Sequence, residues 1–274
     1  MANENQPLTP QQTIRALMML IREMREKFGT KLKIKQKSPL MRLIGAIMFF
    51  NEGFMNDFIT VIGKTIYFPK NWEGIIKDCE HHLDSGADDS DFPITSIPEA
   101  RNLFGILCHE YVHQKDFKSN KLFPVLYLYP AIFAVPGLIG LIMSFWDINC
   151  IFLVAFLLYG LPTPAYWRSL YEARGYATNL VLRSLLYGNE QDRDHNLSHL
   201  YMKYFTGPSY YWMSGHPFFN KLIGKMTGGA YVNGVHKMVE KRFDDAAATI
   251  ESRECGKLDE LEHVYRIVNK VQKG

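Results

Sequence analysis

Apolar and polar residues alternate along the chain in patterns that predict a mostly helical fold with a short sheet. From Thr13 to Lys27 apolar residues recur every three or four positions with charged residues between them, which predicts an amphipathic helix. A second apolar run covers Leu40 to Phe50. The stretch from Phe58 to Pro69 is rich in β-branched and aromatic residues and is interrupted by Gly63, so we expect a short hairpin or bent pair of strands there.

Further helices are predicted in the centre and at the end of the chain. Ser96 to Glu99 has the features of a helix start, with a serine cap, an early proline and a glutamate at the capping-box position. The same periodicity predicts a helix from Tyr166 to Leu186 and two closing helices, Val235 to Ile250 and Leu258 to Val271.

The segment 122–167 has the composition of a membrane hairpin. Asp147 is its only formally charged residue, and it divides the segment into 122–146 and 148–167. As helices these halves would be roughly 30 to 37 Å long, which matches a hydrocarbon core of about 30 Å. The alternative is a buried helical hairpin of a water-soluble protein. The membrane interpretation is favoured because the rest of the chain is only moderately hydrophobic.

Basic residues flank this predicted hairpin on both sides. Lys115, Lys118 and Lys121 precede it, and Arg168 and Arg174 follow it. By the positive-inside rule both flanks face the cytoplasm, so the predicted location is a membrane with the catalytic part on the cytoplasmic side.

These elements predict an α+β fold that is predominantly helical, with a zincin-like active-site helix, a short β-sheet and an inserted two-helix membrane hairpin. The expected organisation is an N-terminal catalytic part (1–121), the hairpin (122–167) and a helical C-terminal part (168–274).

Composition excludes several classes of function. The 274 residues include 31 Lys and Arg against 28 Asp and Glu, so no strong positive field points to a nucleic-acid partner. The four cysteines are scattered without a C-x-x-C pair, which argues against a disulfide framework or a thiolate zinc site and fits a reducing compartment. The polar start, Met1 to Gln12, lacks the layout of a signal peptide.

The segment His109-Glu110-Tyr111-Val112-His113 carries the clearest candidate chemistry. Two histidines four positions apart on a helix project from one face and can bind a single zinc ion. Glu110, beside the first of them, is the expected general base that takes a proton from the attacking water and returns it to the leaving amine. The alternative is an exposed helix that carries two histidines by accident.

A catalytic zinc needs a third protein ligand and an open position for water. The best candidate is Glu172, which lies in a polar stripe at helical spacing with Arg168, Tyr176, Asn179 and Arg183. The alternative for Glu172 is a surface ion pair with Arg168. Asp116, three residues after His113, competes as the third ligand, but a straight helix would spread three ligands along its axis. We therefore expect Asp116 to orient a ligand histidine.

Other polar residues are weaker candidates. His195 and His199 share the four-residue spacing without an adjacent glutamate, and His81-His82 adjoins an acidic stretch and is expected to be solvated. The candidates for stabilising the oxyanion are His216, Tyr176, Tyr210 and Tyr211.

The order of these parts resembles the HtpX and CAAX-prenyl-protease type of membrane gluzincin, which has a strand, an HExxH helix, a membrane hairpin and a helix with a glutamate. The resemblance covers roughly Asn56 to Leu186, and it matches at residue level only in the HExxH segment and Glu172. It implies a zinc endopeptidase with one zinc per chain, held by His109, His113 and Glu172, with Glu110 as general base. It also implies that the strand Lys64 to Phe68 pairs with an extended polypeptide substrate.

One position departs from that family, which usually has an aspartate four residues after the ligand glutamate, where this chain has Tyr176. The run Thr60 to Pro69 and the spacing of Arg168, Glu172 and Tyr176 also resemble small metallopeptidases encoded by bacteriophages. The function expected from the sequence is a membrane-associated zinc metalloendopeptidase. The alternative is a non-catalytic membrane-associated structural or adaptor protein with a structural or vestigial zinc site, and the oligomeric state is not predicted.

Overall fold

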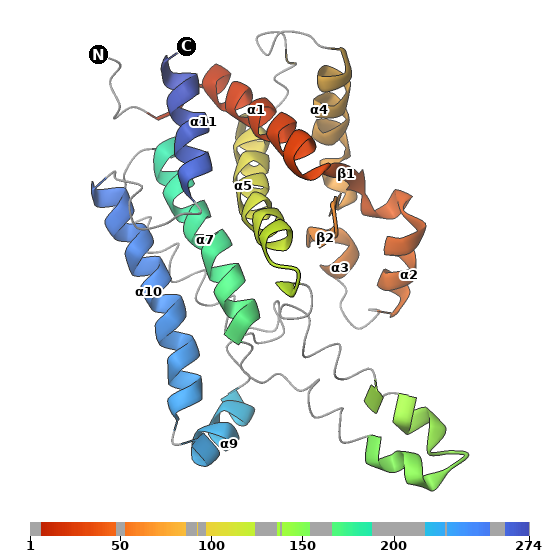
Figure 1. Ribbon diagram of the computed structural model, residues 1–274. Coiled ribbons are helices and arrows are strands. Elements are labelled where there is room, and N and C mark those ends of the chain that lie inside the picture. Colours follow the sequence, from red (N-terminus) through yellow and green to blue (C-terminus); the bar gives the residue numbers. More distant parts are fainter. Residues whose placement is uncertain are drawn as a thin grey trace. The chain divides into compact units, whose positions relative to one another are not determined.

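The computed structural model is predominantly helical and contains one small three-stranded sheet, which confirms the α+β prediction at this level (Figure 1). It describes residues 7–47, 53–85, 92, 97–123, 136–137, 139–153, 166–187, 217–227, 229–252 and 261–273. In chain order the elements are α1 (Pro10–Phe28), β1 (Lys31–Ile34), η1 (Lys35–Lys37), α2 (Pro39–Ile47), α3 (Gly53–Asn56), β2 (Thr60–Ile62), β3 (Thr65–Phe68), η2 (Lys70–Trp72), α4 (Glu73–Ser85), α5 (Ile97–Ser119), α7 (Tyr166–Tyr187), α9 (Pro217–Thr227), α10 (Ala230–Ser252) and α11 (Glu262–Lys273).

The chain divides into two compact units that are not continuous in sequence. Unit 1 comprises Met1–Lys118, Leu182–Gly188 and Glu260–Gly274, and unit 2 comprises Ser119–Val181 and Asn189–Asp259. The helix α7 therefore begins in unit 2 and places its last turn in unit 1. The three consecutive segments expected from the sequence stay a prediction.

Helix α1 begins and ends at residues with clear local signals. At its start, the Thr9 side chain accepts a hydrogen bond from the Gln12 backbone N–H, and the Gln12 side chain accepts one from the Thr9 backbone N–H, which forms a capping box. At its end, Gly29 adopts a left-handed conformation (φ 68°), and its N–H donates to the Arg25 carbonyl oxygen at 2.9 Å. The helix predicted from Thr13 to Lys27 is confirmed.

The sheet has the strand order β1-β3-β2, with β1 parallel and β2 antiparallel to β3. The hairpin predicted around Gly63 is confirmed, because Ile62 and Thr65 are partners across a two-residue turn in which Gly63 has φ 58°. The expected substrate pairing along Lys64 to Phe68 is wrong. Both hydrogen-bonding edges of β3 are occupied by neighbouring strands, so no edge is left along Thr65 to Tyr67 for an added strand.

The core of unit 1 surrounds α5. Its buried residues come mainly from α1, the sheet, α4, α5, the last turn of α7 and α11. Leu103, Phe104 and Leu107 of α5 are each 0% exposed, and Leu182 of α7 packs in the same cluster. The first half of α5 is thus held by hydrophobic packing immediately before the HExxH segment.

Replacing Phe104 with alanine is expected to lower the free energy of unfolding by about 3–5 kcal/mol, because the side chain is completely buried and its loss leaves a cavity. Urea denaturation monitored by circular dichroism measures this change. The matched control is Asn102→Ala at an exposed position of the same helix, with an expected change within about 0.5 kcal/mol. Equal losses in both variants would contradict the packing described.

Unit 2 contains α9, α10 and the first four turns of α7. The buried side of α10 is formed by residues at helical spacing, including Val235, Val239, Phe243 and Ala246. Tyr171 of α7 makes an edge-to-face contact with Phe123 at a ring-centroid distance of 4.6 Å. The predicted helices at Tyr166–Leu186 and Val235–Ile250 are confirmed as α7 and α10, and the helix predicted at Leu258–Val271 is confirmed as α11 (Glu262–Lys273).

Most of the predicted membrane hairpin lies outside the described residues. Within the described parts of the chain, no helix has both the length and the apolar character required to cross a membrane. The described piece 139–153 contains short helical turns around Asp147. Its apolar side chains are strongly exposed, with Phe145 at 83%, Trp146 at 81% and Phe152 at 78%.

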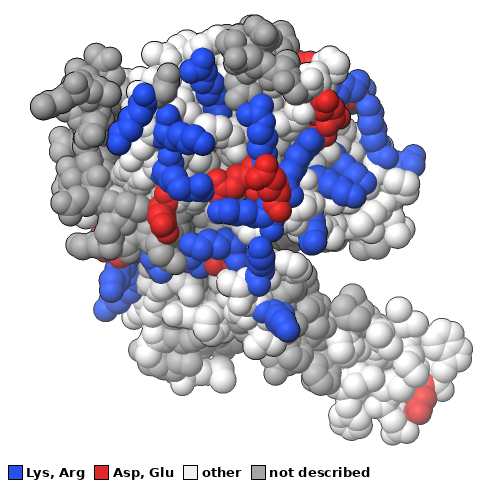
Figure 2. Space-filling view, turned by 45° about the horizontal axis from the view of Figure 1, so that its top comes forward, with Lys and Arg blue, Asp and Glu red and all other residues white. Residues whose placement is uncertain are grey.

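Surface charge of both signs is intermixed near α1. Figure 2 brings forward the top of Figure 1 and shows Lys and Arg side chains around a smaller group of Asp and Glu side chains. Among the ion pairs of α1, Arg25 pairs with Glu80 of α4, and Glu23 pairs with both Lys27 and Arg266. Ion pairs therefore connect α1 to α4 and to α11.

Candidate metal centre

His109 and His113 converge on one point, as their spacing predicts. Both lie on α5, both are buried, and their Nε2 atoms are 3.0 Å apart. Two imidazole nitrogens bound to one tetrahedral zinc at 2.0–2.1 Å would be separated by about 3.3 Å. The histidine pair therefore needs little movement to hold a single ion.

Glu172 completes a group of three side chains that could hold a metal ion. His109, His113 and Glu172 each offer a ligand atom, and these atoms all lie within 4.8 Å of one another. Three atoms so spaced lie within roughly 2.8 Å of a common point, so an inward shift of less than about 1 Å brings each to bonding distance. All three side chains are buried, with Glu172 only 3% exposed.

Glu172 lies 59 positions after His113 in the sequence, and it is part of the continuous helix α7. The last turn of α7 packs Leu182 and Leu186 into the core that also contains Leu103 and Phe104 of α5. Glu172 lies ten residues earlier on the same uninterrupted helix, which corresponds to about 15 Å along its axis. Glu172 therefore lies on the same helix whose last turn is packed in the core of unit 1.

Comparisons of the chain with protein-family models, with curated proteins and with solved structures found no match. The function of this group is therefore inferred from its own geometry and chemistry.

Asp116 and Glu110 lie outside the three-residue group. Asp116 is 6% exposed, but among the described residues the group with ligand atoms in mutual reach consists of the two histidines and Glu172. Glu110 directly follows His109 and is half-buried. This combination suits a base that exchanges protons with water.

Two residues of the polar stripe on α7 are buried, while Arg168, Asn179 and Arg183 are half-buried. Glu172 and Tyr176, one turn apart, are 3% and 6% exposed. An ion pair between Glu172 and Arg168 would therefore not be the solvated surface pair considered from the sequence, because Glu172 is buried. Tyr176 keeps its place on the face that carries Glu172, so it stays a candidate for stabilising an oxyanion.

Two residues near the candidate site belong to the core. Cys108, next to His109, is fully buried in the hydrophobic cluster, and burial raises the pKa of its thiol well above the usual value. His82 is 5% exposed and packs edge-to-face against Phe92 at 5.3 Å, so the expectation that both His81 and His82 are solvated is wrong for His82. It occupies an inward position on α4, a helix that the sequence patterns did not predict. His195, His199, Tyr210, Tyr211 and His216 lie outside the described residues.

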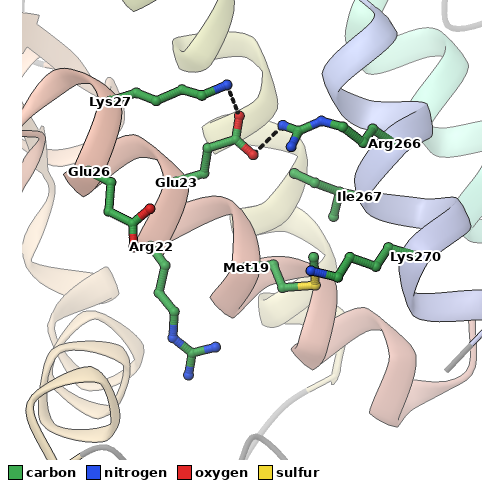
Figure 3. Close-up of a pocket in the computed structure, with 8 residues that line it drawn as sticks. All are labelled: Met19, Arg22, Glu23, Glu26, Lys27, Arg266, Ile267 and Lys270. Atoms are coloured by element: carbon green, nitrogen blue, oxygen red, sulfur yellow. Dashed lines mark hydrogen bonds and ion pairs between the residues drawn. The ribbon is translucent and has the colours of Figure 1, made fainter.

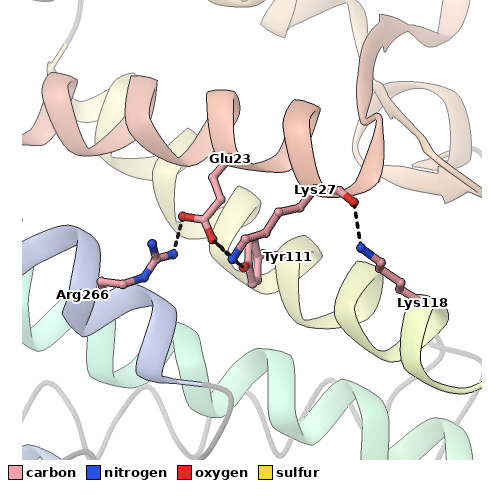
Figure 4. Close-up of polar contacts among 5 residues, drawn as sticks. All are labelled: Glu23, Lys27, Tyr111, Lys118 and Arg266. Atoms are coloured by element: carbon pink, nitrogen blue, oxygen red, sulfur yellow. Dashed lines mark hydrogen bonds and ion pairs between the residues drawn. The ribbon is translucent and has the colours of Figure 1, made fainter.

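The sequence patterns assigned no role to Tyr111, yet its side chain contacts residues of two other helices, and Figure 4 shows its contacts with Glu23 and Lys27. Its hydroxyl donates to Glu23 Oε1 of α1 at 2.6 Å and accepts from Lys27 Nζ at 3.2 Å. Its ring stacks on His263 of α11 at a centroid distance of 3.9 Å and meets Phe28 edge-to-face at 5.1 Å. Tyr111 thus ties α5 to both α1 and α11.

Glu23 should make the stability of the fold sensitive to acid. Burial alone would raise the pKa of Glu23, but hydrogen bonds from Lys27, Tyr111 and Arg266 outweigh it and lower the pKa to about 2. A carboxyl group with a lowered pKa in the folded state contributes stability that is complete above its unfolded value, about 4.5, and is lost as the pH falls toward 2. The free energy of unfolding of the metal-free protein should therefore decrease over this interval.

Glu23→Gln is expected to show a shallower decrease between pH 5 and pH 2 than the wild type, because a glutamine does not titrate. Urea denaturation at intervals of half a pH unit, in the presence of a chelator, measures both curves. Parallel curves for the two proteins would contradict this assignment.

Proposed function

We propose that this protein is a zinc-dependent metallopeptidase in which His109, His113 and Glu172 hold the ion and Glu110 moves the proton. The observation that carries the proposal is the convergence of three buried ligand atoms, all within 4.8 Å of one another, beside a half-buried glutamate. Two histidines and one glutamate are a ligand set of catalytic zinc that leaves a coordination position open for water or substrate.

The chemistry divides between the ion and the side chains. A bound zinc ion would polarise the scissile carbonyl and make the attacking water more acidic. Glu110 accepts the proton of that water and delivers it to the leaving amine, so the peptide nitrogen departs as a neutral amine. Burial of His109, His113 and Glu172 keeps bulk water from competing for their ligand atoms.

The direct test is metal content together with hydrolysis. The full-length chain, purified without chelator, is expected to contain about one zinc per molecule by mass spectrometry of the metal. It should cleave members of a mixed peptide library, lose this activity on treatment with a chelator and regain it when zinc is restored. Absence of bound zinc from protein refolded in zinc-containing buffer would contradict the proposal.

A structural zinc site is the alternative, in which the ion only holds helices together. A structural site is normally closed by a fourth protein ligand. Among the described residues, the group contains three candidate ligands, which favours a catalytic zinc site over a structural one. Stoichiometric zinc with no hydrolysis of any library peptide would instead support the structural role.

We further propose that the chain associates with a membrane through segment 122–167. The support for this proposal is the exposure of residues 139–153 around Asp147, where Phe145, Trp146 and Phe152 are 78–83% exposed. Large exposed apolar surfaces mark contact sites for proteins or membranes, and tryptophan is enriched at the lipid interface. The basic flanks, among them Lys118 and Arg168, favour a catalytic part on the cytoplasmic side.

Replacing both Phe145 and Trp146 with serine is expected to move the protein from the detergent-rich phase toward the aqueous phase in a detergent phase-separation assay. Both side chains are already exposed, so folding should be little affected. The control replaces buried Phe243 of α10 with leucine, which leaves the exposed apolar surface intact. Wild-type protein found entirely in the aqueous phase would contradict membrane association.

A further inference from the structure

Three polar side chains attach one face of α5 to α1 and the turn that follows it. Besides the Tyr111 contact with Glu23, the Thr30 hydroxyl donates to Gln114 Oε1 at 2.7 Å, and both of these residues are buried. Lys118 Nζ donates to the carbonyl oxygen of Lys27 at 3.2 Å (Figure 4). These contacts span two turns of the helix that carries the histidines.

This attached face lies opposite the histidines. A helix turns by about 100° per residue, so Tyr111, Gln114 and Lys118 point within roughly 60° of one another. His109 and His113 point about 160° to 200° away from Tyr111. If the contacts of this attached face were lost, α5 could rotate about its axis. Such a rotation would move both histidine nitrogens sideways, out of line with Glu172.

We propose that Tyr111, held by Glu23, is a positioning residue that fixes the rotation of α5 and thereby the direction in which His109 and His113 present their nitrogens to the metal. This inference rests on the proposed metal site. Tyr111 lies between the two histidines in sequence and on the opposite face in space, so it acts through the helix. Stacking on His263 and the hydroxyl bond to Glu23 constrain the same ring from two other helices.

A surface pocket gives Glu23 access to water. The pocket has a volume of about 350 Å³ and lies between α1 and α11, with Glu23, Arg266 and Lys270 among its lining residues (Figure 3). When the tyrosine hydroxyl is removed, Glu23 keeps Lys27 and Arg266, and water from the pocket can replace the lost donor. Tyr111→Phe therefore removes the positioning bond at little cost in stability.

The decisive measurement is metal affinity of the full-length protein, obtained by competition with a chromophoric chelator for zinc. Tyr111→Phe is expected to weaken zinc binding about tenfold, the lower end of the loss found when residues that orient metal ligands are removed. The visible absorption of the cobalt-substituted protein should change as well, because it reports the ligand geometry.

Two further variants separate positioning from stability. Glu23→Gln loses its charge but can still accept the Tyr111 hydrogen bond, so it should reduce stability more than Tyr111→Phe and metal affinity less. The matched control is Glu80→Gln, which breaks the ion pair between Arg25 of α1 and α4 without touching α5. This control should keep wild-type affinity and the wild-type cobalt spectrum.

The outcomes are distinct for the inference and for the proposed function. Wild-type zinc affinity and an unchanged cobalt spectrum in Tyr111→Phe would overturn the positioning role while leaving the metal site intact. A loss of affinity that follows stability across all three variants would also overturn it. Failure of the wild-type protein to bind zinc would instead count against the proposed function.

Discussion

Glu110→Gln is expected to abolish peptide hydrolysis while the protein still binds about one zinc per chain. The glutamine keeps the size of the side chain but cannot accept a proton from the attacking water. Loss of a general base lowers rates by about 10²- to 10⁴-fold, which would place the variant near the detection limit of most peptide assays. Because Glu110 is outside the group of three ligand candidates, its replacement should leave the metal in place.

The measurement compares turnover of a cleaved library peptide with metal content for the same preparation. Glu99→Gln is the matched control, since Glu99 lies on an exposed position in the first turn of the same helix and should keep full activity and full zinc. Near-normal hydrolysis by Glu110→Gln would remove this residue from the catalytic role. Loss of zinc together with activity would show that Glu110 also supports the ligands.

Long periodic elements of the fold could be predicted from the sequence because their signals are local. The spacing of apolar residues in α1 and α7 repeats over several turns, and the caps at Thr9 and Gly29 mark the ends of α1. The pairing of His109 and His113 is likewise a local property, since a four-residue spacing on a helix fixes it. Such features need no knowledge of distant contacts.

Short elements were missed because their stability comes from partners far along the chain. Strand β1 has only four residues, and it is a strand because β3, more than thirty residues later, pairs with it in parallel. That pairing makes β3 a central strand and removes the edge expected for substrate. Similarly, α4 has a narrow buried side, and the burial of His82 depends on contact with Phe92.

The role of Tyr111 could not be read from the sequence for the same reason. Inside the HExxH segment a tyrosine gives no signal of its own. Its function follows from Glu23, which precedes it by 88 positions, and from His263, which follows it by more than 150. A sequence pattern identifies which atoms can bind a metal, whereas the residues that aim those atoms are specified by packing between helices.

Glu172→Ala is expected to weaken zinc binding by more than about a hundredfold. Removal of residues that only orient a ligand costs 10- to 100-fold in affinity, so removal of a direct ligand should cost at least the upper end of that range. Asp116, the competing candidate for the third ligand, provides the control. Asp116→Asn should keep zinc stoichiometry with at most a modest loss of affinity, because Asp116 is outside the group of three ligand candidates.

Thermal unfolding with and without zinc provides a second, independent measurement of the Glu172 variant. A ligand present at 100 times its dissociation constant stabilises the folded state by about 2.7 kcal/mol, so zinc should raise the melting temperature of the wild type clearly. The same zinc concentration should leave the melting temperature of Glu172→Ala almost unchanged, since a site that binds zinc a hundredfold more weakly is then only half occupied. A normal zinc-induced rise in Glu172→Ala, combined with its loss in Asp116→Asn, would transfer the third ligand to Asp116.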